Sequence, residues 1–260
     1  TKRHPSKMRA KISANVDGKL TAMDFYGDFN TGAYASWGPT VANRVPVHAA
    51  GPYSYPAYRA VSKAVHTNCP PAGAFRGFGV PQASLMQETL FDQLAEKVGM
   101  DPLEFRILNA LENGMPSVTG QVFETGVGFK KCLLELRTPW KQAKAAADSF
   151  NQASDGIIRR GVGVAGMWYG CGNTSLPNPS TMRVGIKSDG TLTLFQGAMD
   201  IGQGSNTVMT QICADALGLP IDQFNLVLGD TDLTADAGKT SASRQTLVSG
   251  KASYLAGVDL

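Results

Sequence analysis

The chain has 260 residues, of which 43% are hydrophobic and 17% are charged, a composition typical of a globular protein with an ample core. Its formal charge is only +3 and its 24 Lys and Arg residues are scattered, which argues against a nucleic-acid partner. No apolar run approaches the roughly 18 residues of a membrane-spanning helix, and none of the four cysteines forms a C-x-x-C pair. We therefore expect a cytoplasmic protein without a zinc site, an iron–sulfur cluster or a membrane span.

Two stretches have the alternating apolar and polar pattern of a β-hairpin. The first covers residues 8–25 and turns at Asp17-Gly18, and the second covers 182–194 and turns at Asp189-Gly190. Both begin with Met-Arg and return through Leu-Thr. This similarity predicts two structurally related halves.

Apolar residues at helical spacing predict a helix over 86–98, which opens near Pro81, and a second helix over 103–111 with Asp101 as its N-cap. The segment 30–58 has no clear period, and we expect irregular structure with one short helix. The other expected elements are a strand at 60–66, a helix at 129–136, a helix after Gly204 that stops at Gly218, a strand at 224–228 and a helical stretch that reaches Leu260.

The polar segment 140–155, rich in Ala, Lys and Gln, is interpreted as a domain boundary, and a new strand is expected over 157–167. The first domain would then cover residues 1–145 and the second residues 155–260. The predicted fold class is α+β, with mixed sheets and packed helices in two related subdomains.

Three loops lead directly into predicted helices: Gly73–Gln82, Gly197–Asn206 and Lys239–Thr246. Each places backbone N–H groups of small residues at a helix start, where they favour anions. One such junction is usually structural, and Gly73–Gln82 taken alone is equally well explained as a tight turn with two core phenylalanines. Three in one chain favour a ligand with several phosphate or heterocycle edges, held by amide groups.

The sequence contains none of the recognisable residue patterns that carry out catalysis in many enzymes. No Ser-His-Asp arrangement and no phosphate-binding G-x-x-x-x-G-K-[ST] motif occurs, and each of the three histidines is taken as structural. The chain thus offers no evident acid, base or nucleophile of its own. A bound cofactor that performs the chemistry explains this absence best.

Taken together, five motifs resemble one family. They are Gly73–Gln82 (GAFRGFGVPQ), Met199–Gly204 (MDIGQG), Ser241–Gln245 (SASRQ), Arg3–Pro5 and Asn30–Tyr34. In order and spacing the chain resembles the molybdenum-binding subunit of the xanthine oxidase family of molybdenum hydroxylases, which includes aldehyde oxidoreductases and nicotinate dehydrogenase.

The resemblance implies a molybdopterin cofactor with molybdenum, expected in its cytosine dinucleotide form, and hydroxylation of an electron-poor carbon. By position it implies catalytic roles beside the metal for Phe75 and Arg76, and substrate contacts from Phe78 and Tyr34. The cofactor-binding residues that it implies are Gly77, Gly202, Gln203, Gly204, Ala242, Ser243, Arg244 and Gln245. No side chain of this chain is expected to ligate the metal, because the pterin holds it.

Two family motifs are absent from the sequence: the G-V-G-E type segment with the catalytic glutamate, and the upstream G-G-G-F-G-G segment. We therefore expect both domains to be partial and the active site in this chain to be incomplete. The chain would be one subunit of a split enzyme, nicotinate-dehydrogenase-like or aldehyde-oxidoreductase-like, or a piece of a larger subunit. Iron–sulfur clusters and FAD are expected on partner chains of a hetero-oligomer.

The expected substrate is a small molecule, either an aromatic N-heterocycle or an aldehyde. Purine-type members of the family carry an arginine shortly after the segment equivalent to 30–32, and Ala35 stands there in this chain. The resemblance therefore argues against a purine and leaves N-heterocycles, aldehydes and hydroxybenzoyl thioesters open. The alternative is a non-catalytic module that binds the cofactor or assists assembly of the same complex. The substrate, the electron acceptor and the choice of a sulfido or selenido ligand stay open.

Overall fold

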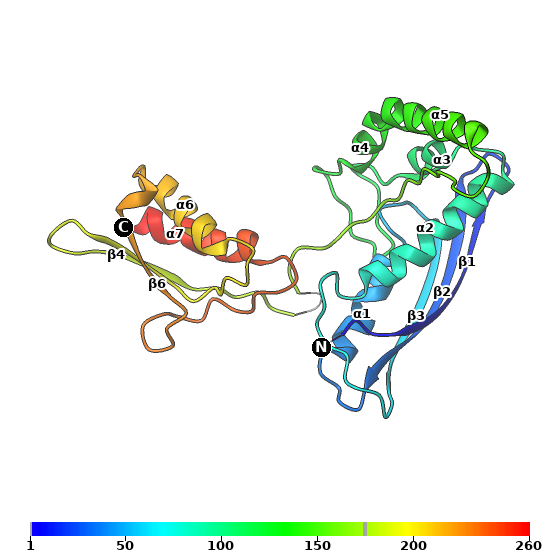
Figure 1. The fold of residues 1–260 in the computed structure, drawn as a ribbon. Coiled ribbons are helices and arrows are strands. Elements are labelled where there is room, and N and C mark those ends of the chain that lie inside the picture. Colours follow the sequence, from blue (N-terminus) through cyan, green and yellow to red (C-terminus); the bar gives the residue numbers. More distant parts are fainter. Residues whose placement is uncertain (1, 174–175) are drawn as a thin grey trace. The chain divides into compact units, whose positions relative to one another are not determined.

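The computed structural model describes residues 2–173 and 176–260, which fold into two compact units (Figure 1). The first unit ends at Tyr169 and the second begins at Gly170. Each unit has its own sheet and its own helices, so the expected α+β class is confirmed. No helix in the described residues is long and apolar enough to cross a membrane.

The first unit is built on a three-stranded sheet. The strands β1 (Ser6–Ala14) and β2 (Leu20–Gly32) form the predicted antiparallel hairpin, and β3 (Ala57–His66) pairs with β2 in parallel. A parallel pairing needs a crossover connection, which α1 (Gly38–His48) provides. The long helix α2 (Val80–Lys97) follows β3.

Three further helices, α3 (Pro102–Asn109), α4 (Phe129–Glu135) and α5 (Arg137–Ala153), complete the first unit. The cap of α3 is the one that its sequence predicts. The carboxylate of Asp101 accepts hydrogen bonds from two backbone N–H groups of the first turn, which otherwise would have no partner.

The second unit repeats the order of the first. The hairpin of β4 (Met182–Ile186) and β5 (Leu192–Gln196) is antiparallel, and β6 (Phe224–Leu228) pairs with β5 in parallel. The crossover is α6 (Ser205–Leu217), and the helix after β6 is α7 (Gly250–Asp259). The order strand, strand, helix, strand, helix thus occurs twice, which confirms the predicted relation between the halves. A 3₁₀ turn at Ile221–Gln223 precedes β6, and a π-helical turn at Gln245–Ser249 leads into α7.

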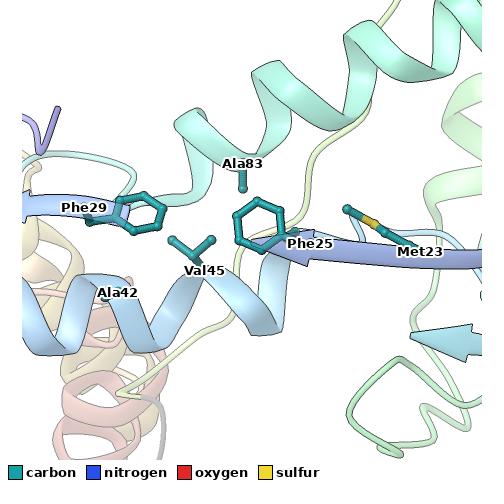
Figure 2. Packing of buried hydrophobic residues seen from close by; sticks show 7 residues of the cluster. Met23, Phe25, Phe29, Ala42, Val45 and Ala83 are labelled. Atoms are coloured by element: carbon teal, nitrogen blue, oxygen red, sulfur yellow. The ribbon is translucent and has the colours of Figure 1, made fainter. Parts of the chain in front are cut away.

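Figure 2 shows the core that joins the sheet of the first unit to its two long helices. Phe25 and Phe29 of β2 lie between Val45 of α1 and Ala83 of α2, and all four are at most 1% exposed. Between the two rings stands Gly27, where a Cβ atom would lie 2.8 Å from the Phe29 ring. Burial of each phenylalanine contributes about 1.5–3 kcal/mol. This packing sets the positions at which α1 and α2 begin.

The polar segment 140–155, which the sequence indicates as a domain boundary, is largely helical in the structure. Most of it belongs to α5, whose Ala, Lys and Gln residues are strong helix formers. Trp140 Nε1 and Lys144 Nζ both donate to the carboxylate of Asp101, at 3.0 Å, and so fasten the helix to the cap of α3. The compact units divide after Tyr169 instead of within 145–155.

The strand predicted over 157–167 does not form, because these residues have no regular secondary structure. Ile157 is 86% exposed and Ile158 is 64% exposed. Alternation of apolar residues favours a strand only where another strand offers its edge, and no described strand pairs with this segment.

Arg106 of α3 is fully buried and joins α3 to α2. Its Nε donates to Glu88 Oε2 at 2.7 Å, and its Nη1 lies 2.9 Å from the carboxylate of Asp92. The hydroxyl of Tyr53 donates to the other oxygen of Glu88 at 2.9 Å. The cost of burying these charges is offset only while every partner is present.

Arg106→Met is therefore expected to lower the free energy of unfolding by about 3–5 kcal/mol, because Glu88 would be left buried without its cation. The matched control is Lys130→Met, which removes a pair with the half-exposed Glu112 and should cost less than about 1 kcal/mol. Denaturant titration measures both values. A loss below about 1 kcal/mol for Arg106→Met would contradict this account of the core.

His48 of α1 is 4% exposed, and its Nδ1 lies 3.0 Å from the carbonyl oxygen of Arg44. Burial lowers the pKa of His48 below its ordinary value, because the apolar surroundings disfavour the imidazolium. Burial lowers the pKa of His4 in the same direction. Both side chains are therefore neutral in the folded protein near neutral pH.

Stability should depend on pH with a defined sign. Below the ordinary histidine pKa of about 6.5, the unfolded chain binds protons that the folded chain does not, so stability is complete above this pH and declines as the pH falls. The melting temperature is expected to be lower at about pH 5.5 than at about pH 7.5. His48→Gln should reduce this difference, whereas His66→Gln, at an exposed position, should leave it intact. If the melting temperature depended equally on pH in both variants, His48 would not be the source of this dependence.

Candidate functional site

Left-handed backbone conformations gather where loops enter helices. Four non-glycine residues of the described chain have positive φ angles: Ser36 (42°), Phe78 (48°), Ala242 (56°) and Ser243 (53°). The first lies just before α1, the second just before α2, and the last two just before the π-helical turn that leads into α7. This conformation costs about 1–3 kcal/mol for a residue with a Cβ atom. Its concentration at these junctions marks them as candidate functional loops.

The loop Gly73–Gly79 makes a sharp turn into α2. Gly77 and Gly79 have φ angles of 88° and 92°, on either side of the left-handed Phe78. A Cβ atom at Gly77 would collide with the ring of Pro81, and one at Gly79 would lie 2.8 Å from Val45 Cγ2. The glycines are therefore required both by conformation and by space.

This loop presents a run of backbone donors. In the described part of the chain, the N–H groups of Phe75, Arg76 and Gly77 have no acceptor, whereas Phe78 N–H donates to the carbonyl of Phe75 at 2.8 Å. Phe75 is 46% exposed, and the side chain of Arg76 is exposed as well. Successive free amides of this kind form a concave site for an anion or an oxygen-rich group.

Two aromatic rings meet at this loop. Phe78 and Trp37, which lies just before α1, form an edge contact with ring centroids 6.0 Å apart and planes at 66°. No sequence motif singles out Trp37, although this residue stands at the start of the crossover helix. Tyr34, which was predicted to contact the substrate, is 71% exposed and makes no ring contact with Phe78 among the described residues.

In the second unit, the loop before α6 binds its own carboxylate. Asp200 accepts hydrogen bonds from the backbone N–H groups of Gly202 (2.7 Å), Gly204 (3.4 Å) and Asn206 (3.2 Å). Bonds from Gly202 and Asn206 hold the pKa of this carboxyl below its usual value. The anion site that helix α6 would offer at its N-terminus is thus already occupied by Asp200.

Gln203 lies at the exposed tip of the same loop. Its Oε1 accepts from Ile201 N–H at 2.6 Å and its Nε2 donates to the Met199 carbonyl at 3.2 Å. The side chain therefore shapes the loop, and it keeps one amide proton and one oxygen lone pair that a ligand can use.

Arg244 is 1% exposed, and its guanidinium donates to the carbonyl oxygens of Ala237 (2.9 Å), Lys239 (3.0 Å) and Pro179. Gly238 allows this approach, since a Cβ atom there would lie 2.6 Å from Nη1. Arg244 was predicted to bind the cofactor. In the structure its side chain holds three loop carbonyls, so any effect on a ligand would pass through the loop backbone.

The structure brings together the two predicted loops of the second unit, Gly197–Asn206 and Lys239–Thr246. The hydroxyl of Thr240 donates to the Met199 carbonyl at 2.7 Å, and Gln245 Nε2 donates to that hydroxyl at 3.0 Å. Next to this link, the N–H groups of Ala242 and Ser243 have no acceptor within the described residues. The second unit therefore brings the loop of Gln203 to the loop of the two free amides, and the buried Gln245 supports this link.

Most donors at these loops are neutral N–H and hydroxyl groups, and the exposed guanidinium of Arg76 adds a positive charge. Among the residues that the structure describes, no group of three or more His, Cys, Asp or Glu is placed to hold a metal ion. The loops can bind and orient an oxygen-rich or heterocyclic ligand, which would have to supply the reactive centre.

Comparison with known proteins agrees with this chemistry. Two domain families, both described as molybdopterin cofactor-binding domains, match residues 1–110 and 134–260. The chain is 50% identical over 139 residues to the nicotinate dehydrogenase large molybdopterin subunit of Eubacterium barkeri, which covers 53% of this chain and 32% of that protein. It is 35% identical over 257 residues to the putative xanthine dehydrogenase molybdenum-binding subunit of Escherichia coli, which covers 96% of this chain and 33% of that protein.

The structural comparison leads to the same family. The crystal structure of the aldehyde oxidoreductase from Desulfovibrio desulfuricans matches with a TM-score of 0.92 and 31% identity, over 99% of this chain and 28% of that chain. The chain thus spans about a third of the length of the relatives that it matches. Fold, loop motifs and sequence agree that this chain belongs to the molybdopterin-binding subunits of the xanthine dehydrogenase and aldehyde oxidoreductase family.

Proposed function

We propose that this chain contributes cofactor-binding loops and part of the substrate pocket of a molybdenum hydroxylase, which inserts a water-derived oxygen atom at an electron-poor carbon of an aromatic N-heterocycle or an aldehyde. The observation that carries the proposal is the loop Gly73–Gly79, where free N–H groups adjoin the Phe78–Trp37 ring pair. N–H groups recognise oxygen atoms, and rings recognise a flat substrate. One loop thus combines both kinds of recognition.

The donor set fits the cofactor that the family binds. Neutral N–H, amide and hydroxyl groups suit phosphate oxygens and the edges of a pterin or a cytosine dinucleotide. When bound, molybdopterin with its molybdenum supplies the oxidation–reduction chemistry of the hydroxylation. In the second unit, the residues that would bind the phosphate and the pterin are Gln203, Ala242 and Ser243. Gly202 and Gly204 donate to Asp200 and so shape the first loop, and Arg244 and Gln245 would hold the second loop in shape.

In the first unit, the loop Gly73–Gly79 would contact oxygen atoms of a ligand. The N–H groups of Phe75, Arg76 and Gly77 would donate to oxygen atoms there, and the exposed guanidinium of Arg76 would add a positive charge that stabilises developing negative charge. Phe78 and Trp37 would bound the ring of an aromatic substrate. Tyr34 would be an outer contact, given its exposure.

An N-heterocycle is the favoured substrate class, because the 50% identity is to a nicotinate dehydrogenase subunit. A purine should also be tried as a substrate. Ala35 stands where purine-type members carry an arginine, but α1 contains Arg44, which is 3% exposed and lies over the Tyr169 ring at 4.4 Å. Electrons would leave through iron–sulfur and FAD groups on partner chains.

Removal of the chain tests the proposal against the alternative of a non-catalytic module. The native complex is expected to contain molybdenum and pterin and to transfer oxygen from isotopically labelled water to nicotinate, a purine or an aldehyde. A complex assembled without this chain should lose this activity, because the loops that orient the reacting groups would be missing. Unchanged hydroxylation without the chain would leave only the assembly role, and a complex without molybdenum would refute both.

Phe78→Ala tests the substrate contact. Loss of an aromatic pair is worth about 0.5–1.5 kcal/mol, so KM for an aromatic substrate should rise about two- to tenfold while KM for an aliphatic aldehyde and the molybdenum content stay the same. Phe78→Leu is the control, because leucine keeps most of the apolar volume and also has to adopt the left-handed φ of 48°. A large loss of molybdenum in Phe78→Ala would instead show that the ring supports the loop.

A further inference from the structure

Three consecutive residues near the start of the chain form hydrogen bonds to the loop Gly73–Gly79 and to the first turn of α2. The carbonyl of Lys2 accepts from Gly73 N–H at 3.2 Å, Arg3 Nη2 donates to the Arg76 carbonyl at 2.7 Å, and the carbonyl of His4 accepts from Gln82 Nε2 at 3.2 Å. The segment thus supports the loop at its start, at its middle and just after its end.

Arg3 makes the central contact with two groups at once. While Nη2 donates to the Arg76 carbonyl, the guanidinium plane lies over the ring of Phe75, 4.6 Å from its centroid. Its second amino group, Nη1, is buried and has no acceptor in the described part of the chain. A lysine could reach either the carbonyl or the ring, but its point charge lacks the planar fork that serves both.

The bond to the Arg76 carbonyl has a consequence for the next residue. This carbonyl and the N–H group of Gly77 belong to one trans peptide plane, in which the two groups point in opposite directions. When Arg3 holds the carbonyl, the Gly77 N–H group points away from Arg3. This N–H group is one of the free donors of the loop.

The loop has little else to hold this peptide plane. Its own bonds are Phe78 N–H to Phe75 carbonyl and Val80 N–H to Gly77 carbonyl, and neither involves the peptide between Arg76 and Gly77. Gly77 has no side chain to restrict its rotation. Without an external contact, the plane could turn and direct the carbonyl, which repels oxygen atoms, towards the ligand.

We propose that Arg3 is a positioning residue, which fixes the peptide between Arg76 and Gly77 so that its N–H group faces the oxygen-bearing end of the cofactor. This inference rests on the proposed function. It differs from the roles implied for Phe75 and Arg76, because the contacts of Arg3 are to the Arg76 carbonyl and the Phe75 ring. It acts through the direction of one backbone donor.

The test compares Arg3→Lys and Arg3→Met with the unmodified complex, each loaded with molybdenum. Arg9→Met is the matched control, since Arg9 also stacks on a ring, that of Tyr26 at 5.0 Å, but lies on β1 away from the loop. The measurements are molybdenum content, the shape of the Mo(V) electron paramagnetic resonance signal, and kcat and KM measured separately.

Arg3→Met is expected to keep molybdenum and KM within about twofold, to lower kcat by about tenfold or more, and to change the resonance signal, because the Gly77 N–H group would no longer be held towards the cofactor. Arg3→Lys, which can still reach the carbonyl, should show smaller changes of the same kind. Arg9→Met should match the unmodified complex in all three. If Arg3→Met does not fold, Arg3→Ala takes its place, since alanine also cannot donate to the Arg76 carbonyl. A folded Arg3→Met or Arg3→Ala complex with unchanged kcat and signal would overturn the proposal, whereas an unmodified complex without molybdenum would overturn the proposed function instead.

Discussion

The direction of a few backbone peptide groups is the constraint on which the functional part of this protein depends. In both units an arginine donates to loop carbonyls: Arg3 to that of Arg76, and Arg244 to those of Ala237, Lys239 and Pro179. Because the C=O and N–H groups of a trans peptide point in opposite directions, a carbonyl held from one side leaves its N–H group on the other. The guanidinium groups of Arg3 and Arg244 thus bind loop carbonyls, while free N–H groups and the exposed side chain of Arg76 stay open to a ligand.

This arrangement suits a ligand whose oxygen and nitrogen atoms are spread over a large molecule. Free amides recognise oxygen atoms at fixed positions and need no counter-charge, so the ligand group that they bind does not have to be fully ionised. The carboxylate of Asp200, which already accepts from Gly202, Gly204 and Asn206, shows the same preference for anions at a loop before a helix. It also shows that one of the three predicted junctions is satisfied internally, which places more of the recognition on Gln203, Ala242 and Ser243.

The repeated order of elements explains why strained residues recur. In each unit a strand ends and the chain must turn sharply into the helix that covers the sheet, as α1 and α2 do over Phe25 and Phe29 (Figure 2). The left-handed Phe78 lies before α2, and Ala242 and Ser243 lie at the equivalent place before α7. Packing of the helices provides the stability that keeps these conformations.

The amino-acid sequence by itself determined the hairpins, most helices, the glycine-rich loops and the family, because these features depend on local periodicity, turn chemistry and contiguous motifs. It did not distinguish the exposed helix α5 from a linker, nor the exposed segment 157–167 from a strand, since both distinctions depend on partners elsewhere in the chain. Only the tertiary structure placed Trp37 against Phe78 and turned Arg244 inwards. Only the tertiary structure brought Arg3 to Arg76, 73 residues away, because the direction of a side chain is decided by whatever the fold packs beside it.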